Sequence, residues 1–215
     1  MKKYFSIPGL MLALVALLMS ASPGYGYREK PADLVSDNSC THGVKKILVT
    51  YDTEHGATSI VAKKVFDTLC QEDFSVDLIF VENFDPAEIL NYDAIVIGSP
   101  IYIGKWLPGI KKLLKRSHAT IAQIPSAFFI TCTYVKGEDD TPERHAHAIE
   151  LYIDPVLSKY PDIQPIDKGV LAGEFQYAEL YPLQFFLMKL AKFEEGNFID
   201  TAKIEAWAKG FGDKL

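Results

Sequence analysis

Cysteine is scarce in this sequence, and its three cysteines show no CxxC motif or other spacing typical of a metal or redox centre. Cys70 and Cys132 lie among apolar residues and are expected to be core residues, whereas Cys40 lies in a polar stretch and could be a free thiol. A disulfide framework is therefore not expected. His145 and His147 are two residues apart on a predicted helix and face different ways, so no metal site is predicted.

Several common functional motifs are also missing. No GxxxxGK(S/T) sequence is present, which excludes a P-loop nucleotidase, and no GxGxxG follows a predicted strand, which removes the usual dinucleotide fingerprint. No nucleophile elbow supports hydrolase chemistry. The 22 lysines and arginines are fewer than the 28 aspartates and glutamates, and a formal charge of −6 argues against a nucleic-acid partner.

An apolar run near the N-terminus, residues 10–19, is shorter than the about 20 residues of a typical membrane-spanning helix. Two lysines precede it, and small and turn-forming residues follow it up to Gly26, which is the order of an export signal. We therefore expect residues 1–26 to be a signal peptide or, if uncleaved, an N-terminal anchor. Residues 27–43 are expected to form a polar linker, and the protein to be exported or membrane-tethered on the extracytoplasmic side.

From residue 44 to residue 215, strand patterns alternate with amphipathic helix patterns. Strands are predicted around 47–51 and over 75–81, 92–98, 126–133 and 168–175. This alternation predicts an α/β domain with a doubly wound, five-stranded parallel sheet in the order 2-1-3-4-5 and helices on both faces. A further helix over 181–193 is predicted as an insertion after the fifth strand.

Three loops are expected at one edge of this sheet, because ligands of such sheets bind beyond the carboxyl ends of the strands. The loops are 50–59, 99–106 and 131–140. The first loop contains hydroxyls and glycine, has no lysine, and leads into a helix N-terminus, where backbone N–H groups and the helix dipole favour an anion. It therefore suits a phosphate monoester held by hydroxyls and N–H groups.

Aromatic residues in the other two loops suggest a flat ring beside that phosphate. These residues are Tyr102, Trp106 and Tyr134. Each of them could equally serve only to pack its loop, but together they suit stacking on a planar ring system. A phosphate monoester and a flat ring together describe FMN.

The same segments resemble flavodoxin-domain proteins. Residues 51–58 with the following helix resemble their FMN phosphate loop, and residues 92–107 resemble their second flavin loop. The C-terminal part resembles the long-chain group that contains menaquinone-dependent protoporphyrinogen IX dehydrogenase, through 169–173, 195–200 and 206–207. This resemblance implies a flavodoxin-like fold and an FMN-dependent oxidoreductase or electron carrier that works with a quinone or a redox partner protein.

The resemblance also implies the cofactor-binding residues. They are Thr53, Glu54, His55, Gly56, Ala57 and Thr58 around the phosphate, Ser99, Pro100, Ile101, Tyr102, Ile103, Gly104 and Trp106 on one side of the ring, and Thr133, Tyr134 and Val135 on the other. No catalytic side chain is identified, because the redox chemistry belongs to the cofactor.

Two acids depart from the family pattern and leave a second interpretation open. Glu54 stands where family members often carry a basic residue, and Asp52 adds a second carboxylate beside the expected phosphate. Two carboxylates near a dianion are unfavourable unless they face solvent, where screening is strong. The alternative is a flavodoxin-like domain that no longer binds FMN and acts as a binding or scaffold module.

The predicted helix over 181–193 has an apolar stripe that covers more than half of its circumference, with Lys189 and Lys192 on the remaining side. It is either a lid packed on the sheet edge or a contact surface for a partner, a quinone or a membrane. Glu194 and Glu195 follow it, and no strongly basic patch is present, so a porphyrin substrate does not follow from the sequence.

Overall fold

The computed structural model describes residues 37–177, 182–190 and 193–215. The predicted signal peptide or anchor, and most of the predicted linker, lie outside these residues. Within the described ranges, no helix has the length and apolar character needed to cross a bilayer. The described chain divides into a large unit, residues 37–174 and 197–215, and a small unit within 175–196.

The large unit is built on a six-stranded sheet in the order β1-β3-β2-β4-β5-β6. Its strands are β1 (Asn38–Cys40), β2 (Lys46–Tyr51), β3 (Ser75–Phe80), β4 (Ala94–Pro100), β5 (Ser126–Cys132) and β6 (Asp167–Ala172). Among strands β2 to β6 every neighbouring pair is parallel, and these five strands lie in the predicted order 2-1-3-4-5. The flavodoxin-like fold class is therefore confirmed.

The predicted number of strands is wrong by one. β1 pairs antiparallel with β3, with Cys40 opposite Val76, so that part of the expected linker is an edge strand. The sequence Asn-Ser-Cys is short and polar and has no apolar alternation, so it carries no strand signal. Its backbone nevertheless pairs with that of β3, which would otherwise lie at the edge of the sheet.

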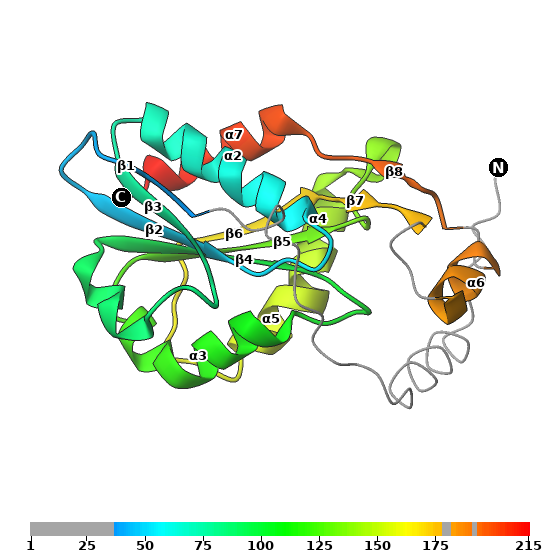
Figure 1. Ribbon diagram of the computed structural model, residues 1–215, viewed down its shortest axis with the longest axis horizontal. Coiled ribbons are helices and arrows are strands. Elements are labelled where there is room, and N and C mark those ends of the chain that lie inside the picture. Colours follow the sequence, from blue (N-terminus) through cyan, green and yellow to red (C-terminus); the bar gives the residue numbers. More distant parts are fainter. Residues whose placement is uncertain (1–36, 178–181, 191–192) are drawn as a thin grey trace. The chain divides into compact units, whose positions relative to one another are not determined.

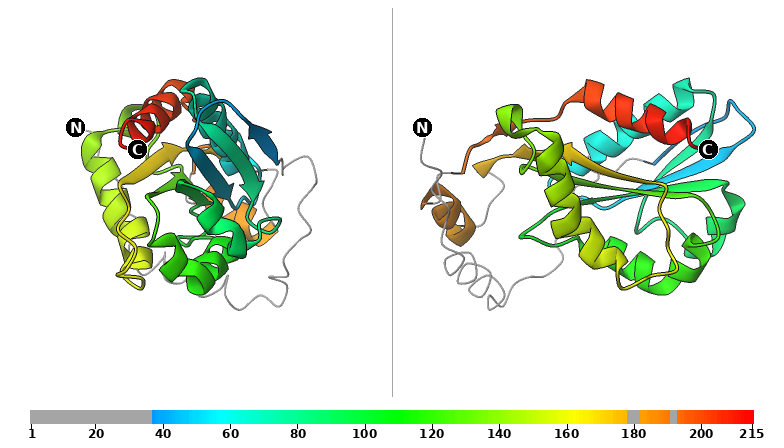
Figure 2. Two further views of the ribbon diagram at one scale, coloured as in Figure 1. Left: turned by 90° about the vertical axis from the view of Figure 1, so that its left-hand side faces the viewer. Right: turned by 180° about the vertical axis from the view of Figure 1, so that it is seen from behind.

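Helices cover both faces of the sheet (Figures 1 and 2). α2 (Ala57–Gln71) and α7 (Thr201–Gly212) lie on one face, and α3 (Pro108–Ile121) and α5 (Asp154–Leu157) on the other. A π-helical turn, Ile149–Ile153, joins α4 (Pro142–Ala148) to α5. This turn ends just before Pro155, where the missing N–H of proline interrupts the helical ladder.

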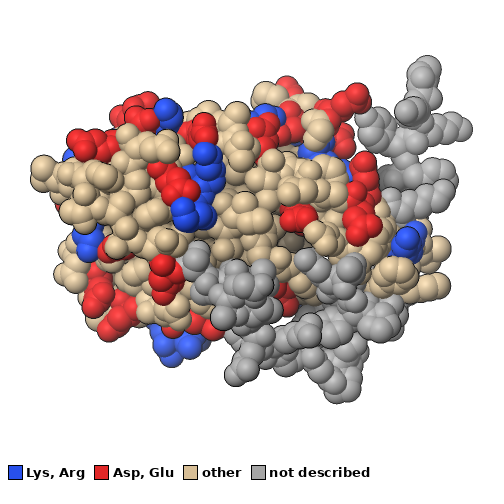
Figure 3. Space-filling model, turned by 45° about the horizontal axis from the view of Figure 1, so that its top comes forward, with Lys and Arg blue, Asp and Glu red and all other residues tan. Residues whose placement is uncertain are grey.

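The core lies on both faces of the interior strands β4 and β5. All residues of β5 and all but the last of β4 are buried, as near-continuous apolar runs predict for a covered parallel sheet. Gly98 is required here, because a Cβ at this position would lie 2.1 Å from the ring of Phe129. On the face shown in Figure 3, acidic and neutral side chains surround the basic ones, which form no continuous patch.

The small unit contains α6 (Pro182–Leu190), and the short strands β7 (Glu174–Phe175) and β8 (Gly196–Asn197) pair at its boundary with the large unit. The predicted helical insertion is thus present. Edge-to-face ring contacts join Tyr177 to Phe175 and to Phe185, with centroids 5.2 and 5.6 Å apart. Aromatic packing of this kind organises a unit too small for a core of its own.

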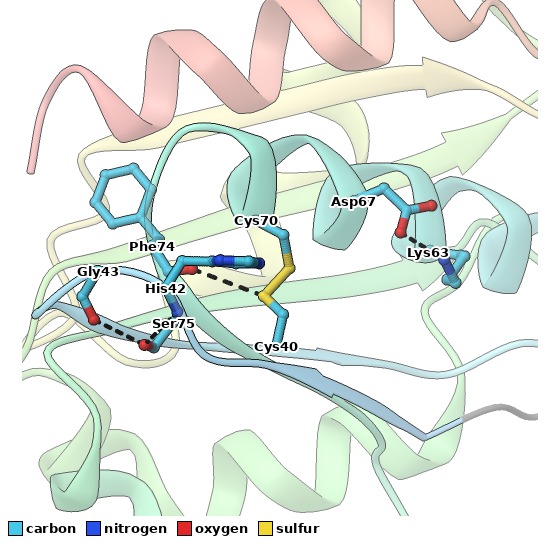
Figure 4. The surroundings of a disulfide bond; sticks show 8 residues. All are labelled: Cys40, His42, Gly43, Lys63, Asp67, Cys70, Phe74 and Ser75. Atoms are coloured by element: carbon cyan, nitrogen blue, oxygen red, sulfur yellow. Dashed lines mark hydrogen bonds and ion pairs between the residues drawn. A yellow bond between two sulfur atoms is a disulfide. The ribbon is translucent and has the colours of Figure 1, made fainter.

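Cys40 is not a free thiol. It forms a disulfide bond with Cys70 in the last turn of α2, with the two Cα atoms 6.3 Å apart (Figure 4). The bond ties the edge strand β1 to the end of α2 and encloses β2 and the first predicted loop. The free thiol expected at Cys40 is therefore wrong, whereas Cys70 packs against the core and Cys132 is buried, as expected.

We expect Cys40→Ser to lower the free energy of unfolding by about 3 kcal/mol, because a cross-link restricts the unfolded chain more strongly than the folded one. The half-cystines are 30 residues apart in sequence. Denaturant unfolding with and without a thiol reductant measures the effect. Reductant should destabilise the wild-type protein by a similar amount and leave the variant unchanged. Three reactive thiols in the denatured, unreduced wild-type protein would contradict the bond.

Candidate functional site

The three predicted loops meet at the carboxyl edge of the sheet, where β2, β4 and β5 end side by side. The hydroxyls of Thr58 and Thr131 lie 2.7 Å apart and join the first loop to the end of β5. The rings of His55 and Tyr102 lie 5.9 Å apart and join the first loop to the second. The N–H of Ile101 donates to the Thr131 carbonyl at 2.9 Å. The topology therefore brings the three segments into direct contact.

The first loop ends at a helix N-terminus that can bind an anion. Gly56 precedes α2 at φ 92°, in the left-handed region that glycine tolerates, and it has no side chain with which to cap the helix. The turn is fixed from within, because the Thr53 hydroxyl accepts a hydrogen bond from the Gly56 N–H at 3.0 Å. The N–H groups of Ala57 and Thr58 thus begin a helix of 15 residues whose first turn contains no acid.

These donors fit a phosphate monoester. Thr53 and Thr58 are each 1% exposed and bring hydroxyls to the same edge as the first-turn N–H groups. A dianion gains most from hydrogen bonds that are charge-assisted and preorganised. The donor set therefore matches the phosphate end of FMN, while Glu54 and His55 lie half-buried in the same loop.

Asp52 adopts an arrangement that the sequence did not indicate. Its carboxylate is fully buried rather than turned to solvent. One carboxylate oxygen accepts the Thr53 N–H at 2.9 Å, and the other accepts the Gly109 N–H at 3.0 Å, in the first turn of α3. The negative charge of Asp52 thus lies at the positive end of the α3 dipole.

The second loop closes as a tight hairpin with a strained tip. Tyr102 and Lys105 exchange both backbone hydrogen bonds, at 2.9 and 3.1 Å, around Ile103 and Gly104. Both tip residues have positive φ, 50° and 71°, which is the pattern of a type I′ turn. A β-branched residue is unfavourable in this region, and strain of this kind is concentrated at binding sites.

Trp106 lies in the core rather than at the surface of the second loop. It is 3% exposed, its indole N–H donates to the Tyr152 carbonyl at 2.8 Å, and its ring lies 6.2 Å from that of Phe128. The N–H of the next residue, Leu107, donates to the Ser99 hydroxyl at 3.1 Å and closes the base of the loop. Tyr102, which is half-buried, is therefore the aromatic of this loop that faces the sheet edge.

The third loop is held by α4. Arg144 lies over the Tyr134 ring at 4.7 Å and donates to the Tyr134 carbonyl at 3.1 Å, while it pairs with Asp139 at 3.0 Å. The His147 ring lies 5.9 Å from the same tyrosine. Thr133 and Tyr134 are half-buried, and Val135 is fully buried in the core. These contacts fix the position of the Tyr134 ring before any ligand binds.

Asp140 ties the end of the third loop to two helices. Its carboxylate accepts hydrogen bonds from His145 of α4 and Lys203 of α7, and its side chain is only 10% exposed. Burial raises the pKa of the Asp140 carboxyl, but the hydrogen bonds from Lys203 and His145 outweigh burial and hold that pKa below its ordinary value. A contact between residues 63 positions apart leaves no local pattern in the sequence.

We expect Ile103→Asn to raise the free energy of unfolding by about 1 kcal/mol, because asparagine tolerates the left-handed region better than isoleucine does. Gly104→Ala is the matched opposite change. A Cβ at Gly104 meets no atom of the described residues within 4 Å, so the variant isolates backbone strain and should be destabilised. Thermal unfolding measures both, and shifts of the same sign in both variants would contradict the type I′ turn.

We expect Asp140→Asn to destabilise the protein more at pH 7 than near pH 3. The folded pKa of Asp140 is lowered, so its contribution is present above the unfolded pKa of about 4 and is lost as pH falls through the folded pKa. Asp162→Asn is the control, since Asp162 pairs with His118 at the surface, where such pairs contribute little. Equal loss of thermal stability in Asp140→Asn at both pH values would show that ionisation of Asp140 is irrelevant.

Comparison with known proteins agrees with this geometry. The family model described as "Flavodoxin domain" matches residues 48–201, a range that includes all three loops. Protoporphyrinogen IX dehydrogenase (quinone) of Escherichia coli strain K12 is 25% identical over 159 residues, which are 74% of this chain and 84% of that protein.

Solved flavodoxins share the fold. Oxidised flavodoxin 1 from Bacillus cereus matches with a TM-score of 0.52 and 11% identity, over 79% of this chain and 99% of that one. A short-chain flavodoxin associated with a PDU bacterial microcompartment matches with a TM-score of 0.52 and 15% identity, over 80% and 99%. Sheet order, loop geometry and the family match lead to one conclusion: the chain belongs to the flavodoxin-domain family.

Proposed function

We propose that this protein is an FMN-binding oxidoreductase that passes electrons from a reduced substrate to a quinone or a partner protein. The observation that carries the proposal is the start of α2, where first-turn N–H groups and the hydroxyls of Thr53 and Thr58 gather at the edge that also holds Tyr102 and Tyr134. Membership of the flavodoxin-domain family supports FMN as the ligand of such an edge. The printed name of the Escherichia coli relative supports a quinone as the acceptor.

In this proposal the chain's own residues bind and orient the cofactor. The N–H groups of Ala57 and Thr58 and the Thr53 and Thr58 hydroxyls would hold the phosphate, and the loops of Tyr102 and Tyr134 would flank the ring. FMN, when bound, supplies the redox chemistry. Trp106 would act by supporting its loop from the core, since its ring is almost fully covered.

The alternative, a domain that no longer binds FMN, is less well supported by the side-chain contacts. Its evidence was the pair of acids in the first loop. Asp52 is bound to the Thr53 and Gly109 N–H groups, so its charge is already matched by donors. Of that pair, only Glu54 then still supports the alternative.

We also propose that the protein works outside the reducing cytosol. Disulfide bonds persist mainly in oxidising compartments, and Cys40–Cys70 is therefore independent support for the export signal predicted at residues 1–26.

In the small unit, Phe185, Phe186 and Leu190 of α6 are 42%, 62% and 57% exposed. These large apolar side chains support α6 as a contact for a quinone, a partner or a membrane surface.

We expect purified protein to bind FMN, and Thr58→Val to weaken that binding at least about tenfold, because one donor to a charged group is lost. Riboflavin, which lacks the phosphate, should bind the variant and the wild type equally. Thr68→Val is the matched control, since Thr68 is equally buried in the same helix but donates to the Lys64 carbonyl. Fluorescence titration measures the affinities. A colourless wild-type protein that takes up no FMN would overturn the proposal and favour the scaffold alternative.

A further inference from the structure

We infer that Asp52 is a positioning residue that joins the phosphate loop and the ring loop of the flavin site into one rigid unit. The inference rests on the proposed function and assigns a role to one of the two acids that opposed it. Asp52 lies at the carboxyl end of β2, where its N–H continues the sheet ladder to the Gly98 carbonyl at 3.0 Å. It therefore occupies a fixed position between the first loop and the second.

The two oxygens of the Asp52 carboxylate serve different loops. The oxygen that accepts the Thr53 N–H at 2.9 Å fixes the entry to the first loop. The oxygen that accepts the Gly109 N–H at 3.0 Å, 57 residues further along the chain, fixes the helix into which the second loop runs. Removal of the first hydrogen bond leaves the buried Thr53 N–H without a charged acceptor, and removal of either leaves the fully buried carboxylate short of a donor, which is costly.

The start of α3 depends on residues outside the helix. Its N-cap is Leu107, whose apolar side chain cannot accept a hydrogen bond, and Pro108 has no N–H. The Leu107 N–H donates to the Ser99 hydroxyl, and the Gly109 N–H donates to Asp52. The first turn of α3 is thus capped by the ends of β2 and β4, which are the strands that carry the two loops.

The hydrogen bond between Asp52 and Gly109 requires that position 109 carry no side chain. A Cβ at Gly109 would lie 2.5 Å from the Asp52 carboxylate oxygen and 2.7 Å from Cγ1 of Val81. Any side chain at position 109 would therefore push the carboxylate away from the helix. A glycine that permits so close an approach indicates that the geometry of this hydrogen bond matters.

The test is titration of FMN and riboflavin into the wild type and two variants that break the same contact in different ways. Asp52→Asn removes the charge and turns one acceptor into an amide donor, which then faces an N–H group. Gly109→Ala keeps the charge and displaces the carboxylate. We expect each variant to weaken riboflavin binding, because the ring loop loses support, and to weaken FMN binding further, by roughly tenfold in all, because the phosphate loop loses the same support.

The matched control is Asp167→Asn. Asp167 also accepts the N–H of its following residue, Lys168, at 2.8 Å, but it begins β6 and so lies at the amino edge of the sheet. The Asp167→Asn variant should bind both flavins as tightly as the wild type does. Because riboflavin has no phosphate, the comparison of ligands separates a change in the ring loop from a change in the phosphate loop.

Each other outcome decides against the inference. If Asp52→Asn raises FMN affinity and leaves riboflavin unchanged, Asp52 acts as a charge that repels the phosphate. If either variant lowers thermal stability with no change in affinity for either flavin, the contact only stabilises the fold. If the wild type binds no FMN, the proposed function fails and the inference fails with it, whereas wild-type binding with unchanged variants refutes the inference alone.

Discussion

The candidate site depends on which groups accept hydrogen bonds from the N–H groups in the first turns of α2 and α3. α2 and α3 both begin at the carboxyl edge of the sheet, and neither Gly56 nor Leu107 offers a capping side chain. At α3 the protein supplies its own acceptors, the Asp52 carboxylate and the Ser99 hydroxyl. At α2, Gly56 and the first turn supply no acid, and we propose that the phosphate of FMN is the acceptor there. This difference between the starts of the two helices is the physical basis for the proposed phosphate site.

The fold could be predicted from the sequence because its signals are periodic and local. Apolar strands that are buried on both faces alternate with amphipathic helices, and the handedness of the crossovers leaves few possible sheet orders. β1 escaped prediction because three polar residues carry no periodicity, and the Cys40–Cys70 bond escaped because it depends on the position of β1. Both features depend on contacts between segments that are distant in sequence.

The candidate site could be predicted as a set of loops but not as a set of contacts. Loop positions follow from where strands end, so the approach of Thr58 to Thr131 and of His55 to Tyr102 was foreseeable. The burial of Trp106 was not, because an aromatic in a loop can face the core or the solvent with the same sequence pattern. Nor was the role of Asp52, whose partner Gly109 is distant in sequence.

The central claim is that the edge formed by these loops binds FMN with its phosphate on α2, and a crystal structure of the FMN complex tests it most directly. We expect the phosphate to accept hydrogen bonds from the N–H groups of Ala57 and Thr58, the flavin ring to lie between the loops of Tyr102 and Tyr134, and Asp52 to remain bound to Gly109. A phosphate bound elsewhere on the protein, or a carboxylate of Asp52 displaced from α3, would contradict the account.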